Sequence, residues 1–91
     1  MYMPTLYPEG NCTDIMVKYA RENLKIGEDT NLELIRQWYA IHYPKFKSKT
    51  IESHAYMNSK GSDVRMSHPL GRAVDIFQFK GNGIFTRIID D

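Results

Sequence analysis

The sequence predicts a small α+β domain in which three helices are followed by a C-terminal β-hairpin. Three features carry this prediction: two stretches with apolar residues at helical spacing, a short polar helix after residue 49, and two β-branched and aromatic runs around Gly-Asn-Gly. A chain of 91 residues, of which 42% are hydrophobic, has the composition of a globular domain and room for one hydrophobic core.

The N-terminal segment, residues 1–11, is expected to be an extended arm, and residues 12–91 are expected to form the folded domain. Pro4, Pro8 and Gly10 interrupt any helical or strand pattern in the arm. The domain therefore begins with the first helix.

This first helix is predicted to run from Thr13, as N-cap, to a C-terminal stop at Gly27. Apolar residues recur between them at helical spacing: Ile15, Met16, Tyr19, Ala20, Leu24 and Ile26. They should form the side of the helix that faces the core.

A second amphipathic helix is predicted after Thr30 and before Pro44. Asp29, Thr30 and Asn31 offer caps, Thr30 and Glu33 match the spacing of a capping box, and Pro44 cannot continue a helix. The apolar positions again follow helical spacing: Leu32, Leu34, Ile35, Trp38, Tyr39 and Ile41.

The third predicted helix, Thr50–Asn58, is short and only weakly apolar, with Ser48 or Thr50 as its cap. Ile51 and Ala55 share its inward side, so the helix should lie on the surface with a polar side outward. The expected outward residues are Lys49, Glu52, Ser53 and Tyr56. Residues 58–73 are polar and are predicted to form a long loop.

The end of the chain predicts a β-hairpin. Residues 74–79 and 84–89 are rich in β-branched and aromatic residues, and Lys80-Gly81-Asn82-Gly83 separates them. Glycine and asparagine adopt the positive φ angles that tight hairpin turns need.

Charge is distributed unevenly along the chain. Residues 1–41 carry four basic and six acidic groups, whereas residues 42–80 carry seven basic and three acidic groups and all three histidines. The chain therefore has a formal net charge of only +1 but one basic half, and a local positive field of this kind attracts polyanions.

Several short stretches resemble a family of DNA-binding domains. Thr50–His54 and His68-Pro69, followed by residues 75–80 and 81–85, are similar to the small winged-helix domain at the C-terminal end of restriction endonucleases and, more distantly, to that of the Dam-replacing restriction enzymes. Phe85 stands where a tyrosine is common, and the nuclease half has no counterpart here. The resemblance implies a winged helix-turn-helix fold whose hairpin is the wing, duplex DNA as partner, and sensitivity to base methylation.

The candidate DNA contacts combine cations, hydroxyls and turn residues. Lysines immediately before the third helix would add to the positive end of its dipole, where phosphate binds, while serine can hydrogen-bond to either base. The candidates are Lys45, Lys47, Lys49, Thr50, Ser53, Tyr56, Arg65, His68, Arg72, Lys80 and Asn82. For Asn82, turn chemistry is an equal explanation.

The sequence predicts neither an enzyme nor a metal or cofactor site, because His42, His54, His68 and Cys12 lack metal-ligand spacing and no nucleophile pair is evident. A single cysteine and the absence of a signal-peptide or membrane-span pattern predict a cytoplasmic protein. The competing interpretation is a winged helix that binds protein, for example a nuclease or transcription partner, through exposed tyrosines. These tyrosines are Tyr2, Tyr7, Tyr43 and Tyr56. The oligomeric state is left open.

Overall fold

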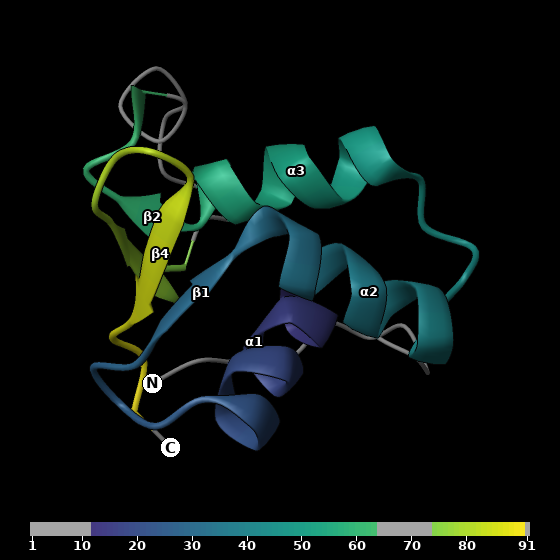
Figure 1. Cartoon of the computed structure of the whole chain (residues 1–91), viewed down its shortest axis with the longest axis horizontal. Coiled ribbons are helices and arrows are strands. Elements are labelled where there is room, and N and C mark those ends of the chain that lie inside the picture. Colours follow the sequence, from purple (N-terminus) through teal and green to yellow (C-terminus); the bar gives the residue numbers. More distant parts are fainter. Residues whose placement is uncertain (1–11, 64–73, 91) are drawn as a thin grey trace.

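The computed structural model describes residues 12–63 and 74–90 and confirms a small α+β domain (Figure 1). Its described elements are, in chain order, α1 (Cys12–Asn23), β1 (Asp29–Asn31), α2 (Leu32–His42), α3 (Ser48–Met57), β2 (Ser59–Lys60), β3 (Phe77–Phe79) and β4 (Ile84–Arg87). The expected arm, residues 1–11, and the segment 64–73 lie outside the described residues.

Four strands form one sheet in the order β1-β4-β3-β2. The antiparallel pair β3-β4 confirms the predicted hairpin. β1 pairs antiparallel with β4, so that Thr30 lies opposite Phe85, and β2 pairs in parallel with β3. Neither β1 nor β2 was predicted, and the prediction of a loop beginning at residue 58 is wrong at Ser59–Lys60. Both strands are too short and too polar to show an alternating pattern.

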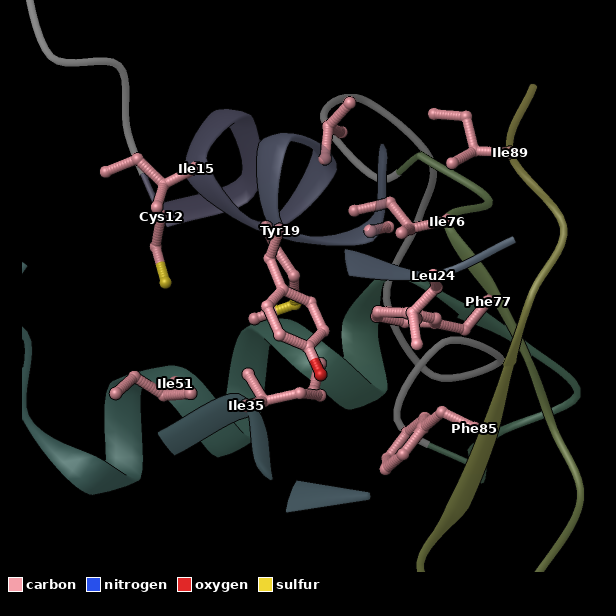
Figure 2. Close-up of a cluster of buried hydrophobic side chains, with 14 of the residues drawn as sticks. Cys12, Ile15, Tyr19, Leu24, Ile35, Ile51, Ile76, Phe77, Phe85 and Ile89 are labelled. Carbon is pink, nitrogen blue, oxygen red and sulfur yellow. The ribbon is translucent and has the colours of Figure 1, made fainter. Parts of the chain in front are cut away.

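The core lies between the helices and the sheet. Figure 2 shows Tyr19 extending from α1 toward Ile35, with Phe77 and Phe85 on the sheet side. The buried hydrophobic residues are Cys12, Ile15, Met16, Val17, Tyr19, Ala20, Leu24, Ile35, Tyr39, Ile51, Ala55, Ile76, Phe77, Phe85 and Ile89. All three helices and the hairpin therefore share one core.

The ends of α1 differ from the prediction. The helix already begins at Cys12, so Thr13 lies inside it rather than capping it, and it ends four residues before Gly27. Ile26, expected in the apolar face, follows the helix and is 62% exposed. Gly27 has a φ of 89° and donates its N–H to the carbonyl of Arg87, which directs the chain into β1.

The cap of α2 is Asn31, whose side-chain oxygen accepts the N–H of Leu34 at 2.9 Å. The predicted capping box is wrong because Thr30 is buried in β1, where its hydroxyl is 2.7 Å from the hydroxyl of Tyr19. A strand that pairs only through tertiary contacts thus moves the start of the helix by one residue.

Candidate nucleic-acid interface

α3 has the two sides that the sequence predicts. Ile51 and Ala55 are buried, whereas Lys49 and Ser53 are exposed. Figure 1 shows α3 along one border of the molecule, with its C-terminal end toward β2 and the hairpin. In the described part of the chain, the outward side of α3 is thus exposed at Lys49 and Ser53.

Three lysines surround the start of α3, and we call Lys45, Lys47 and Lys49 the lysine cluster. All three are exposed. Phe46, between the first two of them, is half-buried, and its ring stands perpendicular to that of Tyr39 with a centroid distance of 5.7 Å. The Lys45 ammonium lies 5.4 Å from the centre of the Phe46 ring. The packing of Phe46 against Tyr39 thus holds the segment before α3 in place, while the three lysines remain exposed to solvent.

The N-terminus of α3 has no side-chain cap. Its N-cap residue is Lys47, with φ −77° and ψ 150°, so the expectation that Ser48 or Thr50 caps the helix is wrong. The first N–H groups of a helix have no partner within it, and together with the helix dipole they favour an anion. The lysine cluster therefore stands where backbone groups already favour phosphate.

Glu52 is the acidic residue of α3. Its carboxylate accepts a hydrogen bond from Arg36 of α2 at 2.7 Å, and both side chains are about half-buried. Such a partly exposed ion pair adds only about 0–1 kcal/mol to stability. Its larger effect is to neutralise the negative charge beside the lysine cluster.

Tyr56 does not project freely from the outward side as expected. It is half-buried, and its ring packs edge-on against Phe79 and Phe85 at centroid distances of 5.3 and 5.2 Å. These contacts join the C-terminal end of α3 to the hairpin. The ring of Tyr56 therefore belongs to the packing between helix and sheet.

The hairpin turn carries the predicted Lys80 and Asn82, both exposed. Asn82 has a φ of 54° between two glycines that also have positive φ, so the turn conformation accounts for its identity. The Lys80 ammonium lies 3.8 Å from the Asp29 carboxylate, which weakens its local field. Lys80 is the stronger candidate of the two for a backbone phosphate.

One further cation, Lys60, was not among the predicted contacts. It is exposed on β2, where its carbonyl accepts the side-chain amide of Gln78 at 2.9 Å. No sequence signal could indicate a two-residue strand. The predicted contacts Arg65, His68 and Arg72 lie outside the described residues.

A hydrogen-bonded group fixes α3 to α1. The Thr13 hydroxyl oxygen lies 3.1 Å from Nδ1 of His54 and accepts the side-chain amide of Asn58 at 3.0 Å. Burial lowers the pKa of His54 from its usual 6.5. His54 thus helps to place α3 and is not an outward contact.

We expect His54 to make the stability of the domain depend on pH. The folded state favours the neutral ring, so the stabilisation is complete above pH 6.5 and is lost as pH falls through the lowered pKa. The slope of the unfolding free energy should stay below about 1.4 kcal/mol per pH unit for one proton. Urea unfolding of wild type and His54→Asn between about pH 7.5 and 5 would measure it. A wild type that loses no more stability than the variant would contradict the assignment.

Cys12 has the properties of a structural residue. Burial raises the pKa of its thiol to about 11, which leaves almost no nucleophilic thiolate at neutral pH. The Tyr39 hydroxyl donates to the Cys12 carbonyl at 2.8 Å. Within residues 12–63 and 74–90, no three His, Cys, Asp or Glu residues are grouped to hold a metal ion.

Comparison with known proteins yields no relative from which a function could be carried over. No family model, curated protein or solved structure matches the chain. In the described part of the chain, no helix is long and apolar enough to cross a membrane.

Proposed function

We propose that this chain is a winged-helix domain that binds duplex DNA through the outward side of α3. The element order and the sheet support this proposal. β1 lies between α1 and α2 in the sequence and pairs with the second strand of the C-terminal hairpin, and α2 packs against α3. In such a domain the third helix enters the major groove and the hairpin is the wing beside it.

The observation that carries the proposal is the lysine cluster at the uncapped start of α3. Three exposed lysines lie at or next to the helix N-terminus, and the acidic residue of this helix is paired with Arg36. Phosphate oxygens are the ligands that such a group of donors attracts most strongly.

The contacts divide into two kinds. The lysine cluster and Lys80 would bind backbone phosphates and so fix the position of the domain, while Ser53 and Thr50 would approach base edges. Ser53 is exposed and Thr50 is half-buried. α3 is ten residues long, or about 15 Å, so cations at its start and in the hairpin turn would reach phosphates on both sides of the helix.

Fluorescence anisotropy with a labelled duplex of about 20 base pairs at about 50 and 200 mM salt tests the proposal. Lys47→Ala/Lys49→Ala should weaken binding roughly 10- to 100-fold at about 100 mM salt and make the salt slope about 2 smaller. The matched control is Lys18→Ala/Lys25→Ala, which removes the same charge from exposed positions on and just after α1. Equal losses in the two variants would leave only a net-charge effect and contradict the assigned face.

Adenine- and cytosine-methylated versions of the same duplex address the methylation sensitivity that the family resemblance implies. A preference for one modified duplex that survives at the higher salt would support base readout by α3. Equal binding to all duplexes would restrict the function to phosphate contact.

The competing function is binding to a protein partner. An exposed apolar surface on α2, separate from the lysine cluster, supports it. Tyr43 and Tyr56, named as candidates for such a contact, are half-buried, but Leu34 and Ile41 on α2 are exposed. Failure to bind any duplex at low salt would favour binding to a protein partner through this surface.

A further inference from the structure

The turn of the C-terminal hairpin combines an exposed asparagine with a glycine directly after it. Asn82 and Gly83 are the two central residues of this turn, with φ angles of 54° and 74°. The N–H of Ile84 closes the turn by donating to the carbonyl of Gly81 at 3.0 Å. Positive φ at both central residues is the conformation of a type I′ turn. Asn82 is exposed, so its side-chain amide is in contact with solvent at the tip of the hairpin.

Two groups of this pair that can react with each other are not held by hydrogen bonds. Within the described residues, neither the side-chain amide of Asn82 nor the backbone N–H of Gly83 makes a hydrogen bond. A Cβ atom placed on Gly81 or Gly83 would meet nothing within 4 Å, so there is open space around the tip. Glycine also has the widest range of backbone angles. The backbone of the tip can therefore rotate until the Gly83 nitrogen approaches Cγ of Asn82, without displacing another side chain.

The other asparagines in the part of the chain that the structure describes are held in place. The side-chain amide of Asn23 donates to a backbone carbonyl at 3.0 Å, and the side-chain oxygen of Asn31 accepts a backbone N–H at 2.9 Å. Asn58 is completely buried and hydrogen-bonded through both its side-chain nitrogen and its side-chain oxygen. None of these three residues is followed by glycine, and a side chain on the next residue hinders attack by its backbone nitrogen. Asn82 differs from them in both respects.

We propose that Asn82 is a site of spontaneous modification, at which its side-chain amide is converted to a carboxylate through a cyclic imide. Hydroxide removes the proton of the Gly83 N–H, and this nitrogen then forms a bond to Cγ of Asn82. The bond from Cγ to the side-chain nitrogen breaks, and the leaving group takes a proton from water and departs as ammonia. Water then opens the ring at one of its two carbonyls. Opening at one carbonyl gives aspartate, and opening at the other gives isoaspartate, in which the backbone runs through Cβ and Cγ.

The two products should differ in their effect on the hairpin. Both add a negative charge at the tip, two residues after Lys80. Aspartate, like asparagine, adopts a positive φ more readily than most residues, so the aspartate product should keep the turn. Isoaspartate adds one carbon to the backbone of the turn, which should weaken the hydrogen bonds from Lys80 to Ile84 and from Ile84 to Gly81. The modification does not depend on the proposed DNA binding.

Peptide mapping by mass spectrometry, after incubation of the folded chain at neutral and at alkaline pH, measures the reaction. The peptide that contains Asn82 should gain one mass unit, at a rate that increases with hydroxide concentration. Enzymatic methylation of isoaspartate identifies the second product. Asn82 should react at least about tenfold faster than Asn23, Asn31 and Asn58, which corresponds to a difference of about 1.4 kcal/mol in activation free energy. Asn82→Gly retains a residue suited to the turn and should abolish the mass gain in this peptide.

Incubation in guanidinium chloride separates the effect of the fold from that of the sequence. Asn58 loses its buried hydrogen bonds on unfolding and should then react faster, whereas Asn82 should react in both states. A folded chain that shows no reaction at Asn82, or that reacts equally fast at Asn23 and Asn31, would overturn the proposal. The variant Asn82→Asp supplies the aspartate form directly. A sample enriched in isoaspartate should unfold at a lower urea concentration than this variant, and equal midpoints would contradict the expected effect on the hairpin.

Discussion

Phe85→Ala is expected to lower the free energy of unfolding by about 3–5 kcal/mol, because it leaves a large cavity in a closely packed cluster of rings. Phe85 is completely buried, and the ring centroids of Tyr56, Phe77 and Phe79 lie 5.2 to 5.7 Å from its own. A domain of this length has a total stability of only about 5–14 kcal/mol. The expected loss is therefore a large fraction of the total stability.

Urea denaturation followed by circular dichroism measures this loss. The matched control is Phe79→Ala, which removes a ring from the same cluster at a half-buried position. Phe79→Ala should lower the free energy of unfolding by about half as much, because folding buries less apolar area of the Phe79 ring. If both variants lost the same free energy, the ring cluster would not be centred on Phe85.

Asn58→Leu is expected to lower the free energy of unfolding by about 3–4 kcal/mol with little change of volume. The Asn58 side chain is completely buried and donates to the Thr13 hydroxyl at 3.0 Å and the His54 carbonyl at 2.8 Å. Its oxygen accepts the N–H of Val74 at 2.9 Å. Leucine can replace none of these bonds. The N–H of Val74 would lose this acceptor, and the Thr13 hydroxyl and the His54 carbonyl would each lose one of their hydrogen bonds.

Asn31→Ala provides the comparison for Asn58→Leu. Asn31 also uses its side-chain oxygen to accept a backbone N–H, but only the single bond that caps α2. Loss of this capping bond should lower the free energy of unfolding by about 1 kcal/mol. Thermal and urea unfolding of both variants would give the difference, and equal losses would show that Asn58 does not link the segments as its contacts indicate.

Much of the candidate site could be predicted because it depends on local properties. Lysines around a helix start reach solvent in almost any fold. The pairing of Glu52 with Arg36 could not be predicted. It joins residues sixteen positions apart and requires the packing of α3 against α2.

The sequence by itself determined the elements whose cause is local. Apolar residues at helical spacing predict α1 and α2, and Gly81-Asn82-Gly83 predicts the hairpin because all three residues adopt the positive φ angles of that turn. These features depend on neighbouring residues and on backbone sterics. They would be much the same in another tertiary setting.

Only the tertiary structure decided which polar groups are buried and where the short strands lie. β1 and β2 exist because β4 and β3 offer them hydrogen-bond partners. Arg87 is buried because the carbonyls of Leu24 and Ile89 accept its guanidinium. The exposure of Leu34 and Ile41 likewise follows from the side of α2 that packs on α1 and α3. Apart from Ile89, these partners are distant in sequence, and burial of a polar group is favourable only when its partner is in place.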